Sequence, residues 1–215
     1  MEANPIAKKT LIISLAAIVS VEWVLRAVVS RGLFDSMVVL GAGRLLETIL
    51  VILVLVIWGG GVSSVGLAPS QIIRGFKRGL VWSAGFGIVA FIAFAVLYLA
   101  GINPLILTQA RLPTSLGEII LFFFIGGILG PVGEEVFFRG ILYGFFKRWG
   151  VILAVALSTL LFVAAHPMSY KGVFAPQVVG GIVFAVAYEI EGSLMVPITV
   201  HVLGNMAIFT LSLMA

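Results

Sequence analysis

The chain contains no cysteine among its 215 residues. That absence excludes a disulfide bond, a thiol nucleophile and a metal site built from thiolates. Charged residues are also scarce, at 10% of the chain, against about a quarter in a typical soluble domain. Because 61% of the residues are hydrophobic, the composition indicates an integral membrane protein.

Long apolar runs fill the chain, and we expect about seven of them to cross the membrane as helices. The expected spans are 10–29, 36–58, 79–100, 116–147, 150–166, 173–190 and 194–214. The stretch PSQIIRGFKRG, at 69–79, mixes apolar and basic residues and predicts a short interfacial helix. Gly130 and Pro131 predict a kink in the fourth span. The predicted fold is an all-α polytopic transmembrane helical bundle, a single integral membrane domain over 1–215 with its motif-bearing core at about 116–215.

The basic residues indicate an orientation for these spans. If the N-terminus is cytosolic, the side with more positive charge is the cytosolic one, as the positive-inside rule requires. The cytosolic connections then hold Lys8, Lys9, Arg74, Lys77, Arg78, Lys147 and Arg148, and the opposite side holds Arg31, Arg44, Arg111 and Lys171. We therefore expect a cytoplasmic-membrane protein with a cytosolic N-terminus. Most of the basic residues lie in these connections, so the formal net charge of +4 gives no indication of nucleic-acid binding.

Several ionisable groups and both histidines lie inside the predicted spans, where a charge costs at least about 2.5–3.5 kcal/mol. They are Glu22, Arg26, Glu47, Glu134, Glu135, Arg139, His166 and His201. Glu22 and Arg26 interrupt the first run, and no small-x-small cleavage site follows it. A retained helix is therefore expected there rather than a signal peptide, with these two residues paired at i, i+4. The other groups must face protein or a wet cavity.

The depth of the polar groups along their helices is similar. At a rise of about 1.5 Å per residue, Glu134 lies about 20 Å and His166 about 25 Å from the turn at 147–149, measured along their helix axes. The last span starts near 193, on the same side of the membrane as that turn, and His201 and Asn205 lie about 12 Å and about 18 Å from its start along the helix axis. Three separate helices could therefore bring these side chains to one site, although spacing alone does not require it.

The two adjacent glutamates differ in their local partners. Glu135 and Arg139 are four residues apart on one helical face and can pair, which is the commoner structural use of such residues. Glu134 is rotated by about 100° from that face and has no local partner. It is therefore the carboxylate available to a cavity.

Three motifs on the late spans resemble one family. GEEVFFRG, at 133–140, fits Glu-Glu-x-x-x-Arg; FVAAH, at 162–166, fits Phe-x-x-x-His; and HVLGN, at 201–205, fits His-x-x-x-Asn. In this order they are similar to the CPBP family, which groups type II CAAX prenyl endopeptidases with bacteriocin-processing and immunity-associated (Abi-like) intramembrane proteases. The resemblance implies hydrolysis of a peptide bond in a membrane-tethered or lipidated, CAAX-type protein substrate.

The resemblance also implies the roles of the motif residues. One Glu–His pair, Glu134 and His166, would activate the attacking water, and His201 with Asn205 would stabilise the oxyanion. Three further residues would support the site: Glu135, Arg139 and Phe162. Ser158 and Ser169 lack a placed acid, so no serine triad competes with this interpretation.

Metal dependence and two other function classes stay open. The chain has no HExxH motif, yet Glu134, His166 and His201 could bind zinc with one open position. We expect activation of water without a metal, and keep zinc as the alternative cofactor. Polar groups at mid-membrane also fit an ion- or proton-coupled transporter, although no paired broken segments are present. A non-catalytic membrane partner protein is the third class.

Overall fold

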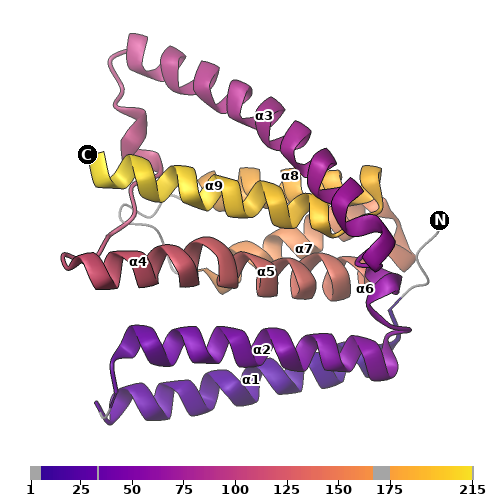
Figure 1. The fold of residues 1–215 in the computed structure, drawn as a ribbon. Coiled ribbons are helices and arrows are strands. Elements are labelled where there is room, and N and C mark those ends of the chain that lie inside the picture. The colour runs from indigo at the N-terminus through magenta and orange to yellow at the C-terminus, as the bar shows by residue number, and fades with distance from the viewer. Residues whose placement is uncertain (1–5, 33, 167–174, 215) are drawn as a thin grey trace.

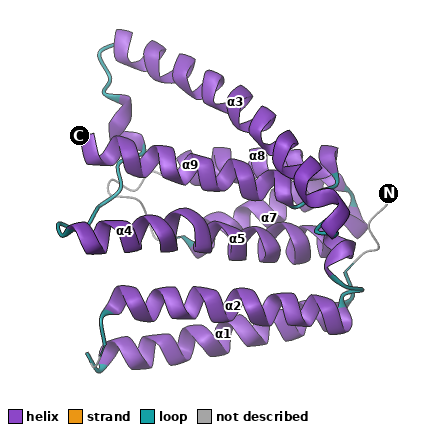
Figure 2. Cartoon of the chain, in the orientation of Figure 1, coloured by secondary structure: helices purple, strands orange, loops and turns teal. Residues whose placement is uncertain are grey.

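The computed structural model describes residues 6–32, 34–166 and 175–214, and within these ranges it contains helices and loops but no strand (Figure 2). The α-helices are α1 (Lys8–Ser30), α2 (Ser36–Trp58), α3 (Pro69–Leu99), α4 (Leu116–Phe124), α5 (Gly130–Glu135), α6 (Gly144–Phe146), α7 (Val151–Ala165), α8 (Ala175–Glu191) and α9 (Met195–Met214). Two π-helical segments, η3 (Ile125–Leu129) and η4 (Val136–Tyr143), join α4, α5 and α6. Shorter 3₁₀ turns are Val62–Val65, Pro104–Leu107 and Lys147–Trp149.

Five helical segments are long and apolar enough to cross a membrane, since a span needs about 20 apolar residues. They are Lys8–Ser30, Ser36–Trp58, Val62–Leu99, Leu116–Trp149 and Met195–Met214. The apolar α7 is shorter, and α8 has 17 residues. The predicted all-α polytopic membrane bundle is confirmed.

The polar stretch at 69–79 is not a separate interfacial helix. It forms the first part of α3, which continues without interruption to Leu99. Pro69 lies in the first turn of α3, where its missing N–H costs no hydrogen bond. Gly75 and Gly79 then let α3 pack closely on the start of α9 and the residue before it, because a Cβ at Gly75 would collide with Ser193 and one at Gly79 with Thr199. This packing holds the polar stretch in line with the membrane span.

The long fourth span contains the irregularity expected near Pro131, but its direction does not break there (Figure 1). The backbone instead switches to π-helical hydrogen bonding over Ile125–Leu129, and Pro131 lies in the first turn of α5, which follows. Single-turn π-helices are frequent at functional sites. Here the π segment immediately precedes the turn that carries Glu134.

The centre of the bundle is the stretch from Glu135 to Tyr143, in which every residue is buried. It packs against α1 and α2 on one side and α7 and α8 on the other (Figure 1). α1 and α2 form an antiparallel pair beside the fourth span, while α3 crosses α9 near its own N-terminus and then diverges from it. Polar groups in this central stretch have no access to water and need partners within the protein.

Candidate active site

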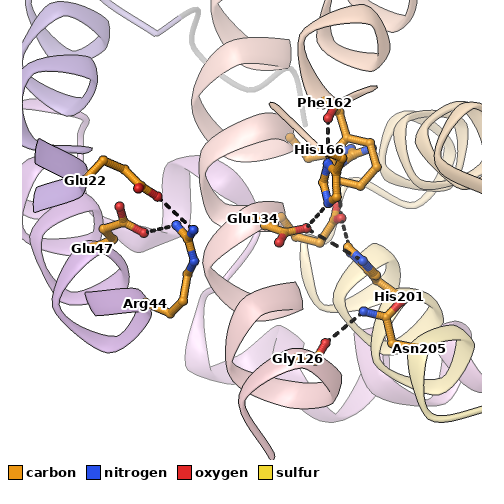
Figure 3. A network of polar contacts seen from close by, with 11 residues as sticks. Glu22, Arg44, Glu47, Gly126, Glu134, Phe162, His166, His201 and Asn205 are labelled. Carbon is orange, nitrogen blue, oxygen red and sulfur yellow. Dashed lines mark hydrogen bonds and ion pairs between the residues drawn. The ribbon is translucent and has the colours of Figure 1, made fainter. Parts of the chain in front are cut away.

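Three of the predicted catalytic side chains meet in the bundle (Figure 3). Glu134 projects from α5, His166 caps the end of α7, and His201 lies on α9. The carboxylate oxygen Oε2 of Glu134 lies 3.5 Å from Nε2 of His166 and 3.8 Å from Nε2 of His201. These three side chains therefore meet at one place, as their similar depths along the helices allowed.

A backbone carbonyl orients His166. Its Nδ1 lies 2.7 Å from the carbonyl oxygen of Phe162, one turn earlier on α7. A carbonyl oxygen only accepts hydrogen bonds, so Nδ1 must carry the hydrogen. The other ring nitrogen, Nε2, is thereby turned toward Glu134 and is an acceptor when the ring is neutral.

A carboxylate orients His201 in the same sense. Its Nδ1 lies 2.7 Å from Oε1 of Glu135, so this nitrogen donates to the carboxylate and Nε2 faces Glu134. This contact was not predicted from the sequence, because the two residues are 66 positions apart and share only their membership in the three motifs. Glu135 therefore supports the site through His201 as well as through its local partner.

The same Glu135 oxygen accepts a hydrogen bond of 2.9 Å from Arg139, and both side chains are fully buried. The predicted i, i+4 ion pair is confirmed. The guanidinium also donates to the carbonyl of Gly181 at 3.2 Å and lies over the rings of Phe162 and Phe184. These contacts compensate the buried positive charge of Arg139, whose side chain has no exposed surface and whose burial without partners would be strongly unfavourable.

Aromatic rings fix the positions of the two imidazoles. The buried Phe162 ring lies 4.4 Å from the ring of His166 and 5.8 Å from that of His201. Phe184, from α8, stacks on His201 at 4.6 Å with an interplanar angle of 21°. Phe184 was not expected from the sequence, since it lies outside the three motifs. Both rings restrict the imidazoles to the orientations that point Nε2 at Glu134.

Asn205 lies one turn beyond His201 on α9, but it makes a different contact. Its amide Nδ2 donates to the carbonyl oxygen of Gly126 at 2.9 Å, in the π-helical segment η3 (Figure 3). The π-helical geometry frees backbone carbonyls from the regular hydrogen-bond ladder, so Asn205 satisfies one of them. Its role toward an oxyanion stays a prediction.

The ion pair expected within α1 is wrong. Glu22 contacts Arg44 of α2 at 2.7 Å, and Arg44 also contacts Glu47 at 2.5 Å. In the part of the chain that the structure describes, Arg26 takes part in no hydrogen bond or ion pair. The guanidinium of Arg44 lies between two carboxylates, so Glu22 pairs with Arg44 instead of Arg26.

A cavity of about 570 Å³ separates the α1–α2 pair from Glu134 and His166. Its volume falls within the range of about 300–1,000 Å³ that ligand pockets occupy. Oxygen Oε2 of Glu134 is buried and has no hydrogen-bond partner among the described residues. Its distances to the two imidazoles exceed those of good hydrogen bonds, about 2.7–3.2 Å, so this oxygen keeps its capacity to accept a hydrogen bond.

Among the described residues, no group of three or more His, Cys, Asp or Glu side chains is arranged to hold a metal ion. Activation of water without a metal stays the prediction, and zinc held by Glu134, His166 and His201 stays its alternative.

Comparisons with known proteins agree with the motifs. Residues 116–207 match the family described as type II CAAX prenyl endopeptidase Rce1-like. An uncharacterized 24.3 kDa protein of Escherichia coli is 29% identical over 143 residues, which cover 63% of this chain and 65% of that protein. The membrane-embedded CAAX protease MroQ of Staphylococcus aureus (strain USA300) is 34% identical over 96 residues, which cover 41% of this chain and 38% of MroQ. No solved structure matches the chain.

The chain therefore spans less than two thirds of the length of either relative. The family match nevertheless begins at the start of α4 and extends beyond Asn205, so it contains all three motifs and every side chain of the candidate site. Together with the similarity to a CAAX protease, it supports the resemblance of the three motifs to the CPBP family and its type II CAAX prenyl endopeptidases.

Proposed function

We propose that the protein is an intramembrane endopeptidase that hydrolyses a peptide bond in a membrane-tethered or lipidated, CAAX-type substrate. The observation that carries this proposal is the approach of Glu134 Oε2 to two imidazole nitrogens at 3.5 and 3.8 Å, at the edge of a cavity within the helical bundle. Hydrolysis needs a base for water and a proton donor for the leaving amine, and a carboxylate beside two imidazoles can supply both.

In the proposed reaction, a water molecule binds between Glu134 and the two Nε2 atoms. Glu134 accepts a proton from this water while the water oxygen forms a bond to the carbonyl carbon of the substrate. The proton then passes to Nε2 of His166, whose Nδ1–H stays on the Phe162 carbonyl. When the carbon–nitrogen bond breaks, Nε2–H of His166 transfers this proton to the amine. The products are a carboxylic acid and an amine, so atoms and charge balance.

The negative charge that develops on the carbonyl oxygen needs donors on the other side of the site. His201 can donate from Nε2 when both of its nitrogens are protonated, because Glu135 holds Nδ1–H in place. Asn205 contributes the second amide hydrogen, since a side-chain amide has two and the Gly126 carbonyl takes one. Glu135 and Arg139 act as positioning residues that hold His201.

The proposed enzyme works without a metal, in the cytoplasmic membrane, with its N-terminus in the cytosol. Purified protein in liposomes, incubated with a panel of farnesylated and acylated peptides, tests the activity. We expect mass spectrometry to detect hydrolysis at a defined peptide bond, with or without EDTA. If no peptide in the panel is cut, while the protein remains folded, the proposal fails. A transporter or a non-catalytic partner protein then becomes the better hypothesis.

A further inference from the structure

The wall of the cavity opposite Glu134 carries its own group of charged side chains, which the proposed reaction does not use (Figure 3). α1 contributes Glu22 and Arg26, and α2 contributes Arg44 and Glu47. These four residues have formal charges that sum to zero. They lie in two spans where charged residues are costly, and they line the same cavity as Glu134 and His166, so they are candidates for contact with the substrate.

This wall is held close to the candidate catalytic glutamate. Thr48 lies against Gly133, and a Cβ at Gly133 would collide with its hydroxyl oxygen. The same hydroxyl donates to the carbonyl of Arg44 at 2.7 Å, so the contact fixes the turn of α2 that carries the guanidinium. Because Gly133 precedes Glu134, the charged wall and the carboxylate are positioned by one helix–helix contact.

The two carboxylates of the wall are both committed to Arg44. Glu47 is the inner partner, with 9% of its side chain exposed, while Glu22 is the outer partner at 31%. Arg44 thus has its charge compensated inside the protein. It is a positioning residue for the wall and is not the group left to bind a ligand.

Arg26 is the cation that remains. It is exposed, it lines the cavity one turn beyond Glu22 on α1, and within the described ranges it has no hydrogen bond or ion pair. A guanidinium inside an apolar span is unfavourable unless it meets an anion or water. The only carboxylate four residues away on its own helix, Glu22, is already bound to Arg44. The cavity therefore presents an uncompensated guanidinium across from Glu134.

We propose that Arg26 binds a carboxylate group of the peptide substrate and so determines which peptide bond lies over Glu134. This inference rests on the proposed protease function. A guanidinium suits the task because it can bind a carboxylate through two parallel hydrogen bonds, which fix orientation as well as position. The carboxylate comes either from the C-terminus of the substrate or from an aspartate or glutamate side chain at a fixed distance from the cleaved bond.

Three panels of N-palmitoylated peptides in liposomes test this inference and separate the two sources. The panels share the same sequences: the first has free C-terminal carboxylates, the second has C-terminal amides, and the third has C-terminal amides with one added aspartate at varied positions. Mass spectrometry gives the rate and the position of cleavage in each panel. The variants are Arg26→Gln, Arg26→Lys and Arg31→Gln, the last being the matched control because Arg31 follows the last residue of α1 and is not a lining residue of the cavity.

We expect the wild-type protein to cut one carboxylate-bearing panel at least about tenfold faster than the plain amides, a ratio that corresponds to about 1.4 kcal/mol. Cleavage should occur at a constant spacing from the carboxylate. Arg26→Gln should bring this rate ratio close to one, Arg26→Lys should retain part of it, and Arg31→Gln should retain all of it.

A wild-type enzyme that cuts all three panels equally would overturn the inference and leave the proposed function standing. An unchanged preference in Arg26→Gln would also overturn it, because the carboxylate would then be recognised by another group. Absence of cleavage in every panel would overturn the proposed function, and this inference with it.

Discussion

The buried ion pair beside the candidate site allows a quantitative test through Glu135→Gln. This change keeps the size of the side chain but removes its charge. Arg139 is fully buried, and Glu135 is the only carboxylate that the described structure places within hydrogen-bond distance of it. The variant therefore leaves a buried guanidinium without a counter-charge, with only neutral partners: the new side-chain amide, the carbonyl of Gly181 and the faces of aromatic rings.

Breaking a buried ion pair from one side costs about 3–5 kcal/mol in soluble proteins. For a chain of this size, that loss corresponds to a decrease in melting temperature of roughly 6–20 °C. The variant also weakens the 2.7 Å contact that sets the orientation of His201. Loss of a partner that orients a functional histidine typically lowers activity by about 10–100-fold. Both stability and activity should therefore fall.

The double variant Glu135→Gln with Arg139→Leu separates the two effects. It leaves no buried charge without a partner, so it should recover much of the lost stability. It does not restore the carboxylate at His201, so activity should stay low. Melting temperature and specific activity are measured on the same purified samples, with Glu118→Gln as a control on the exposed start of α4. Full stability of Glu135→Gln, or recovery of activity in the double variant, would refute this reasoning.

Other predictions concern the helix contact, the amide and the topology. Gly133→Ala should displace α2 and cost about 1–3 kcal/mol of stability through overpacking, and adding Thr48→Ala should relieve it, as paired melting curves would show; a stable single variant would contradict this. Asn205→Ala should lower the hydrolysis rate by about 100–1,000-fold if the amide stabilises the oxyanion. A lower melting temperature with an unchanged hydrolysis rate would show that Asn205 acts only through its hydrogen bond to Gly126. Reporters fused to the termini should place the N-terminus in the cytosol and the C-terminus on the opposite side, and equal signals on one side would show that the spans are miscounted.

Most of the fold followed from apolar run lengths, because a membrane span is defined by local composition. The expected spans at 10–29 and 36–58, for example, correspond closely to Lys8–Ser30 and Ser36–Trp58. The separate helix expected at 69–79 was wrong for a tertiary reason. Local charge indicated an interface, whereas close packing of Gly75 and Gly79 on α9 keeps this stretch continuous with α3.

Pairings within one helix were only partly predictable. Glu135 and Arg139 pair as their spacing indicates, and neither has another ion-pair partner of the carboxylate or guanidinium type among the described residues. Glu22 and Arg26 have the same spacing, yet Glu22 pairs with Arg44, because α2 brings a guanidinium within 2.7 Å of it. Spacing along one helix says which partners are possible, but neighbouring helices decide which one is used.

The candidate site was accessible in outline through the motifs and the helix rise. Similar depths allowed Glu134, His166 and His201 to meet, and they do. The rotation of each helix about its axis was not predictable, so the contact of His201 with Glu135 and the stacking on Phe184 were missed. Both contacts lie between helices that are distant in the sequence, and both determine where an imidazole nitrogen points.

The central claim is that the Glu134 carboxylate activates the water that cuts the peptide. Cleavage of one lipidated peptide by wild-type protein and by Glu134→Gln, at equal amounts in liposomes, tests it most directly, with Glu118→Gln as the matched control. We predict that Glu134→Gln melts as a folded protein and cuts at least about 100-fold more slowly, the low end of what a positioned acid–base group contributes. Glu118→Gln should cut at the wild-type rate. A folded Glu134→Gln variant that retains wild-type cleavage would contradict the account.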